Sequence, residues 1–251
     1  ATSRGMEIYN FCIQHNFLAW YLQLKKIDEV KDFLSNAYKN AIKQKCNSVL
    51  ISAEDFENIL IDEYMAHTME IIAKEIGYNE IEWIFVKRTP FDYLNSLYSE
   101  LSKYGLVYDF YQLYKIIMIH GYYKSTSQFY NNIYIFDLDN LVKSFKKSHS
   151  STISILQFEN FKKPYIGFPI FKELITVDKL KIEEEEIIHE NKSLTSYQIE
   201  FNYVCNFLRL NKGLKSYENN KDIIDTLISH RIQKIKKENK LIKDSINEKF
   251  G

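Results

Sequence analysis

Residues 81–98 place a short apolar run directly before a proline-containing helix start, in the string IEWIFVKRTPFDYLNSLY. The apolar run, residues 83–86, is typical of a buried strand. Thr89 is a suitable N-cap, Pro90 suits the first helical position, and Asp92 lies where the helix dipole favours a negative charge. We therefore expect a strand that ends in a basic pair and passes at once into a helix.

The same strand-then-helix order is predicted twice more. A short apolar run at residues 49–51 precedes a helix over 52–77 that starts with a Ser-x-x-Asp capping box. A β-like run at residues 132–136 precedes a helix over 137–147. Three such units at this spacing indicate an α/β fold, with a parallel sheet flanked by many helices.

Further helices are expected on both sides of these units, over residues 6–24, 27–44, 109–121, 195–210 and 220–250. The last helix is rich in lysine, and apolar residues follow helical spacing along one face, which we expect to pack: Ile224, Leu227, Ile228, Ile232, Ile235, Leu241 and Ile242. We expect one domain over residues 1–251, with a helical C-terminal part at about 195–251.

Composition excludes several classes of protein. The chain has 251 residues, is 45% hydrophobic, and balances 33 Lys and Arg against 33 Asp and Glu, so we predict no general nucleic-acid partner. The sequence has no apolar stretch of about 18 residues and no visible signal peptide, so we predict no transmembrane segment and a cytoplasmic location. The three cysteines and six histidines show no metal-ligand spacing, so we predict no metal.

An anion site is predicted where the second strand ends. Ligands of parallel sheets bind beyond the carboxyl ends of the strands, where Arg88 is expected. Ser96 follows Thr89 by about two helical turns and so lies on the same helix face. A guanidinium, a hydroxyl and a helix N-terminus together suit a phosphate. Lys87 is expected to point to the opposite face, because strand side chains alternate.

The segment from Arg88 through Ser96 to Tyr98, R-T-P-F-D-Y-L-N-S-L-Y, resembles the 3′-phosphate-binding segment of sulfotransferases. These enzymes take a sulfuryl group from 3′-phosphoadenosine 5′-phosphosulfate (PAPS). The resemblance implies that Arg88 and Ser96 hold the 3′-phosphate of this donor. It also implies a P-loop-like sheet and a reaction that needs no metal.

Three other stretches are similar to the bacterial, carbohydrate-type branch of that family. They are residues 49–56, residues 191–195 with the helix at 201–206, and the C-terminal stretch 238–241. The resemblance covers roughly residues 45–250. It implies that Asn191 and Ser193 contact the donor nucleotide, and that the acceptor is a hydroxyl or amine of a glycan or small metabolite.

The N-terminus departs from the family pattern. Sulfotransferases begin with a strand and a loop, typically containing lysine, that binds the 5′-phosphosulfate. Here residues 1–5, ATSRG, stand where the tail of that loop would be, and the strand and the lysine are absent. We expect earlier residues to be missing; a decayed loop and a cloning remnant are the alternatives. In the first case Thr2, Ser3 and Arg4 contact the 5′-phosphosulfate.

Glu54 is the leading candidate for the base that deprotonates the acceptor, because it is expected at a strand end facing the cleft. His15 and His67 are its competitors. Two other functions stay open: a sulfotransferase-like protein without activity that binds a protein partner, and an unrelated nucleotide-dependent transferase that uses the same sheet edge.

Overall fold

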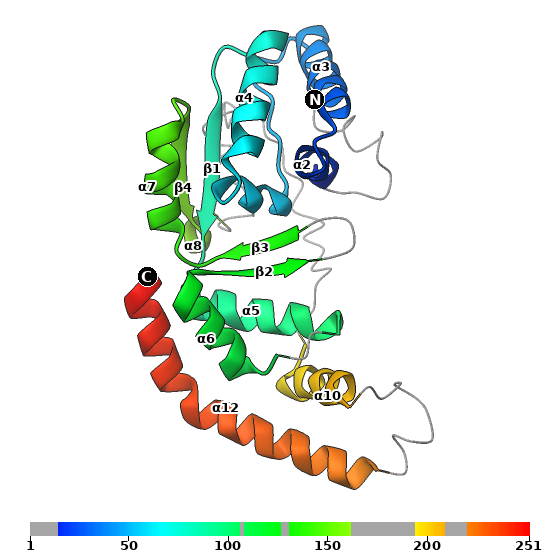
Figure 1. The fold of residues 1–251 in the computed structure, drawn as a ribbon, viewed down its shortest axis with the longest axis vertical. Coiled ribbons are helices and arrows are strands. Elements are labelled where there is room, and N and C mark those ends of the chain that lie inside the picture. The colour runs from blue at the N-terminus through cyan, green and yellow to red at the C-terminus, as the bar shows by residue number, and fades with distance from the viewer. Residues whose placement is uncertain (1–14, 106–107, 127–130, 162–193, 209–219) are drawn as a thin grey trace, which may run out of the picture. The chain divides into compact units, whose positions relative to one another are not determined.

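The computed structural model describes residues 15–105, 108–126, 131–161, 194–208 and 220–251. The chain divides into two compact units (Figure 1). Unit 1 comprises residues 1–87 and 124–175, and unit 2 comprises residues 88–123 and 176–251. The chain therefore passes from one unit to the other between Lys87 and Arg88, and again inside the strand β2.

The described part of unit 1 combines helices with strands: α2 (Asn16–Gln23), α3 (Ile27–Lys43), the 3₁₀ helix η1 (Glu54–Leu60), α4 (Glu63–Ile76), β1 (Glu82–Lys87), β3 (Asn131–Ile135), α7 (Leu138–Ser148), β4 (Thr152–Gln157) and α8 (Phe158–Phe161). The strand β2 (Tyr122–Thr126) pairs with β3 and contains the unit boundary. The fold class is confirmed at the level of a helix-rich, mixed α/β protein.

The sheet at the centre of unit 1 consists of β1 and β4, which run parallel and side by side (Figure 1). Trp83 pairs with Ile153 and Phe85 with Ile155. The rings of Trp83 and Phe85 each meet the Phe145 ring of α7 edge-on, at centroid distances of 6.3 and 6.4 Å. Large apolar side chains on one sheet face therefore form the core under α7.

The predicted sheet is partly wrong. The strand predicted at 83–86 is β1, but residues 49–51 form no strand and the run at 132–136 pairs with β2 instead of joining the parallel sheet. The partner of β1 is β4, which the sequence analysis missed. Within the described residues the parallel sheet has two strands, and the P-loop-like arrangement stays a prediction.

The helix predicted over 52–77 is also wrong in its first part. The 3₁₀ helix η1 comes first, and α4 begins only at Glu63, where the Asp62 side chain accepts the Tyr64 N–H. Gly77 ends α4 with φ +116°, and a Cβ there would lie 2.8 Å from the Tyr38 hydroxyl oxygen. Glycine is thus required at this helix end for both reasons.

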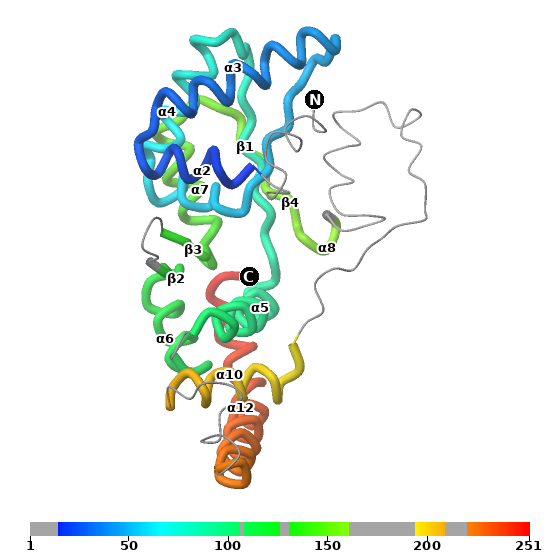
Figure 2. Tube along the Cα trace, turned by 90° about the vertical axis from the view of Figure 1, so that its right-hand side faces the viewer, coloured from blue at the N-terminus to red at the C-terminus, as the bar shows by residue number. Residues whose placement is uncertain are grey.

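Unit 2 is helical in its described part: α5 (Pro90–Lys103), α6 (Phe110–His120), α10 (Ser196–Phe207) and α12 (Lys221–Phe250). Figure 2 shows α10 lying against α12, and their contact forms a core of Tyr203, Val204, Ile224 and Ile228. Capping boxes at Asp109 and Thr195 begin α6 and α10. The helices predicted in this part of the chain are confirmed.

The packed face of α12 is mostly the predicted one. Ile224, Ile228, Ile242 and Ile246 are buried, because they follow one another at helical spacing. Leu227 and Leu241, which were expected on the same face, are 43% and 71% exposed. No helix among the described residues is both long enough and apolar enough to span a membrane.

Candidate functional site

The predicted anion-binding pair meets at the start of α5 in unit 2. The Arg88 guanidinium donates through Nη2 to Ser96 Oγ at 3.4 Å. Arg88 also lies over the Tyr93 ring, 5.8 Å from its centroid. Arg88 is partly buried and Ser96 is exposed. A cation and a hydroxyl therefore share one solvent-facing side of α5, as the sequence predicted.

Local sequence explains this arrangement. Pro90 occupies the first turn of α5, and Thr89 before it has an extended ψ of 123°, as residues before proline prefer. The chain therefore turns sharply at Thr89, and the Arg88 side chain can lie back along the helix. It reaches Ser96, which is on the face of α5 opposite the buried Leu94 and Leu101.

The first turn of α5 is capped from a distant helix. The Thr89 side chain makes no capping hydrogen bond, and the Phe91 N–H instead donates to Asn247 Oδ1 of α12 at 3.1 Å. Phe91 lies about 140° around the helix from Ser96. Asn247 thus accepts a hydrogen bond from one backbone N–H of the first turn, on the packed face of α5. The face that carries Ser96 stays exposed.

Lys87, the neighbour of Arg88 in the chain, is engaged inside unit 1. Its Nζ lies 2.9 Å from Asp139 Oδ2 at the start of α7, and only 11% of its side chain is exposed. An ion pair this enclosed leaves Lys87 little freedom to bind an anion. The basic pair at the end of β1 therefore divides into one lysine paired within unit 1 and one arginine, just before α5, that contacts Ser96 of α5.

Glu54 is the first residue of η1 in unit 1, and its side chain is exposed. The predicted capping box with Ser52 is absent, since Asp55 accepts a hydrogen bond from Trp20 Nε1 at 2.6 Å. Burial raises the pKa of Asp55, the Trp20 hydrogen bond lowers it, and the charge of Glu54 raises it further. Asp55 therefore anchors α2, and Glu54 is the carboxylate that faces solvent.

His15 lies beside the segment that carries Glu54. The His15 backbone N–H donates to the Ser52 carbonyl at 2.8 Å, and His15 Nδ1 lies 3.0 Å from the Ser52 backbone nitrogen and 3.2 Å from the Ser52 carbonyl oxygen. Burial lowers the pKa of His15, against a smaller opposing effect of the Ser52 backbone. His15 Nδ1 is thus held by the Ser52 backbone, whereas the Glu54 side chain is exposed.

A buried polar network at the other end of the sheet was missed by the sequence analysis. Glu70 of α4 accepts hydrogen bonds from Trp83 Nε1 at 2.8 Å and Ser151 Oγ at 2.7 Å, and lies 3.2 Å from His149 Nδ1. Burial raises the pKa of Glu70, but these hydrogen bonds outweigh it and lower the pKa overall. His149 Nε2 is buried beside the His67 ring and has no hydrogen-bond partner among the described residues.

This network is structural by its position. Trp83 lies near the start of β1 and Ser151 directly precedes β4, so Glu70 joins α4 to the amino end of the parallel strands. Ligands of such sheets bind at the carboxyl end. Among the described residues, no group of three or more His, Cys, Asp or Glu side chains could hold a metal ion.

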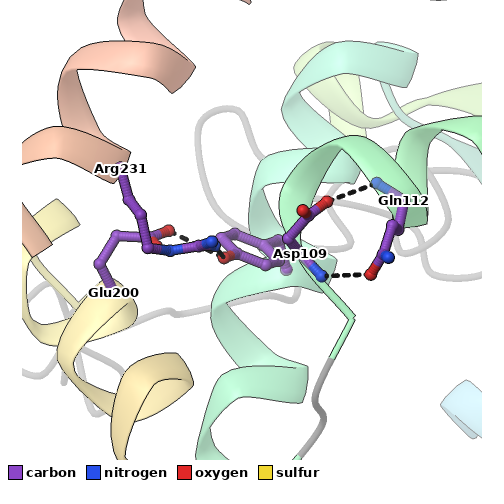
Figure 3. A network of polar contacts seen from close by, with 5 residues as sticks. Asp109, Gln112, Glu200 and Arg231 are labelled. Carbon is purple, nitrogen blue, oxygen red and sulfur yellow. Dashed lines mark hydrogen bonds and ion pairs between the residues drawn. The ribbon is translucent and has the colours of Figure 1, made fainter. Parts of the chain in front are cut away.

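A second buried network, also missed, lies in unit 2 (Figure 3). Arg231 Nε of α12 donates to Glu200 Oε2 of α10 at 2.6 Å, and the Tyr98 hydroxyl of α5 donates to Glu200 Oε1 at 2.8 Å. Burial and the Glu200 carboxylate raise the pKa of Tyr98, so its hydroxyl remains a donor. Tyr98 therefore connects helices, although the sequence singled it out beside Ser96.

Five predicted donor-binding residues lie outside the described residues: Thr2, Ser3, Arg4, Asn191 and Ser193. Of the predicted donor site, the structure therefore describes Arg88 and Ser96, which it brings together, while Glu54 belongs to unit 1. No family model, no curated protein and no solved structure matches this chain.

Proposed function

We propose that this chain is a cytoplasmic sulfotransferase that moves a sulfuryl group from PAPS to a hydroxyl or amine of a glycan or small metabolite. The observation that carries the proposal is the hydrogen bond between Arg88 and Ser96 at 3.4 Å. The spacing of the two residues in the sequence resembles a 3′-phosphate-binding segment. Their side chains then meet on one exposed helix face, where a phosphate oxygen can accept from both.

The chemistry requires charge neutralisation at the leaving group and a base at the acceptor. The acceptor oxygen or nitrogen forms a bond to sulfur, and the bond between sulfur and the 5′-phosphate oxygen breaks. The electron pair of that bond leaves with 3′-phosphoadenosine 5′-phosphate (PAP). Glu54 takes the proton of the acceptor group. Arg88 and Ser96 hold the 3′-phosphate and so position the nucleotide for transfer.

Titration with PAP tests the donor site. We expect Arg88→Ala to weaken PAP binding by about 10- to 100-fold, the range for a lost charge-assisted hydrogen bond, and Ser96→Ala to weaken it less. Lys115→Ala is the matched control, because Lys115 is also a cation of unit 2 that lies over a tyrosine ring, Tyr111, at 4.6 Å. An unchanged affinity in Arg88→Ala contradicts the proposed site. No binding by the unaltered chain favours the inactive, partner-binding alternative.

The role of Glu54 has its own test. Glu54→Gln removes the proton acceptor and keeps the size of the side chain, so we expect kcat to fall by about 100-fold or more while the dissociation constant of PAP stays the same. Glu63→Gln removes a charge from an exposed residue at the start of α4 and serves as the control. Equal kcat values in the two variants exclude Glu54 as the base.

A further inference from the structure

The C-terminal half of α12 carries a dense row of exposed lysines. Five lie within ten residues, and all of them are exposed: Lys234, Lys236, Lys237, Lys240 and Lys243. Four of the five, all but Lys234, fall on about one third of the helix circumference, opposite the buried Ile242 and Ile246. We call these five residues the lysine face.

The five positive charges of the lysine face outnumber the carboxylates beside them: Asp244, four residues after Lys240, is the exposed carboxylate at the C-terminal end of the face. None of the five lysines makes an ion pair or hydrogen bond with another described residue, whereas Lys87 and Lys103 do. Between Asp225 and Asp244 the carboxylate of α12 is Glu238, which is partly buried and lies four residues after Lys234, away from Lys236, Lys240 and Lys243. Like charges three and four residues apart on a helix repel one another, so an anion bound here relieves an unfavourable arrangement.

The helix that presents these lysines is well anchored in unit 2. Arg231 pairs with Glu200 one turn before the lysine face, and Phe250, Ile242 and Ile246 are buried at and beyond its end. The lysine face is therefore a fixed surface, and its side chains need no backbone ordering to meet a ligand. Five charges over about 13 Å of helix give roughly one charge per 3 Å, a density suited to a linear polyanion.

The chemistry of the face narrows the choice of polyanion. The lysine face contains no arginine and no aromatic side chain, and single-stranded nucleic acids are held by stacking on such groups. A membrane-binding helix inserts its apolar face, but the apolar face of α12 is buried. A flexible chain that carries only charges, such as an acidic polysaccharide, needs nothing beyond lysines.

We propose that the lysine face of α12 binds an anionic polysaccharide bearing carboxylate or sulfate groups. The inference rests on the proposed function and specifies its substrate. The acceptor is an acidic glycan, and the lysine face holds the sugar units of the glycan that do not react. The Arg88–Ser96 pair, by contrast, holds the nucleotide. The two kinds of binding depend on different residues and can be tested separately.

The test measures binding of a fluorescent dextran sulfate oligosaccharide, with neutral dextran as the uncharged reference. In the variant Lys236→Gln/Lys240→Gln/Lys243→Gln we expect affinity to fall about 10-fold or more. The slope of log affinity against log salt should also decrease by about 2, at roughly 0.7 per lost contact. The control variant Lys143→Gln/Lys146→Gln/Lys147→Gln removes three exposed lysines of α7 at similar helical spacing and should bind as the unaltered chain does.

Several outcomes overturn the inference. Equal losses in the two triple variants show only a general effect of charge. Tighter binding of an oligothymidylate than of dextran sulfate assigns the face to nucleic acid, and tighter binding of phosphatidylglycerol vesicles assigns it to a membrane. PAP affinity separates the two proposals. A chain that binds dextran sulfate through the lysine face but not PAP disproves the sulfotransferase while retaining the polysaccharide surface. If instead the protein binds PAP and the α12 variant binds dextran sulfate as tightly as the unaltered chain, the polysaccharide surface is disproved and the sulfotransferase proposal is retained.

Discussion

At the scale of single residues, the buried carboxylates differ from those on the surface because each has several hydrogen-bond donors. Glu70 has Trp83, Ser151 and His149, and Glu200 has Tyr98 and Arg231. A buried charge is costly unless it is paired and hydrogen-bonded. Both residues therefore fix the packing of the elements around them. Glu54, at the start of η1, differs from them in being exposed.

Glu70 makes the stability of unit 1 depend on pH. Its lowered folded pKa means that it stabilises the fold at pH values above the unfolded value of 4.5, and that this contribution is lost as the pH falls through the lower folded value. We expect Glu70→Gln to lower the free energy of unfolding by about 1–3 kcal/mol at pH 7, and by less near pH 3. Urea unfolding at both pH values measures this difference. A loss that does not shrink in acid contradicts the assigned role.

Residue-level prediction from the sequence succeeded where the signal was local. The Arg88–Ser96 pair could be predicted because both residues belong to one turn-and-helix segment, whose geometry Pro90 largely determines. The partner of Tyr98 could not be predicted, because Glu200 lies 102 positions away. The same holds for Asp55, which a helix-start pattern assigned to a capping box and which instead accepts from Trp20, 35 positions earlier.

At the scale of elements, helices were predicted better than strands because their caps and apolar spacing are local. The boxes at Asp109 and Thr195 lie within four residues each. Strands depend on a partner, and three apolar residues at 49–51 carry no information on whether one exists. The sequence TISILQ of β4 alternates apolar and polar residues over part of its length, which is a local strand signal but does not identify the partner strand.

The start of α5 gives an element-level prediction that departs from the usual capping rule. Thr89 is the N-cap by position, yet its side chain makes no capping bond, whereas Asn247 accepts the Phe91 N–H. We therefore expect Asn247→Ala to lower the free energy of unfolding by about 1 kcal/mol and Thr89→Ala to lower it by less than about 0.5 kcal/mol. Asn247→Asp keeps the acceptor and should stay close to the unaltered chain. Urea unfolding of the three variants checks the order, and a larger loss for Thr89 than for Asn247 contradicts it.

At the scale of the whole molecule, the chain builds two units with separate cores and separate buried networks. Both tryptophans, Trp20 and Trp83, belong to unit 1, so tryptophan fluorescence reports unfolding of that unit alone. Circular dichroism at the helical band reports both units. The two signals therefore distinguish the stability of one unit from that of the other.

Single substitutions should destabilise one unit and leave the unfolding transition of the other unchanged. Arg231→Leu leaves Glu200 buried without its charge partner, and we expect about 3 kcal/mol of destabilisation in unit 2. The circular dichroism transition in urea should then begin earlier while the tryptophan transition keeps its midpoint. Glu70→Gln should shift the tryptophan transition instead. If each substitution shifts both signals equally, the two units unfold as one.

Recognition of a nucleotide's 3′-phosphate by Arg88 is the step on which the proposed function depends, and one thermodynamic cycle tests it. Isothermal titration calorimetry of the unaltered chain and of Arg88→Ala is performed with PAP and with adenosine 5′-monophosphate, which lacks the 3′-phosphate. We predict that the unaltered chain prefers PAP by about 10- to 100-fold and that Arg88→Ala loses most of this preference. The same preference in both proteins, or tighter binding of the nucleotide without the 3′-phosphate, would contradict this role of Arg88.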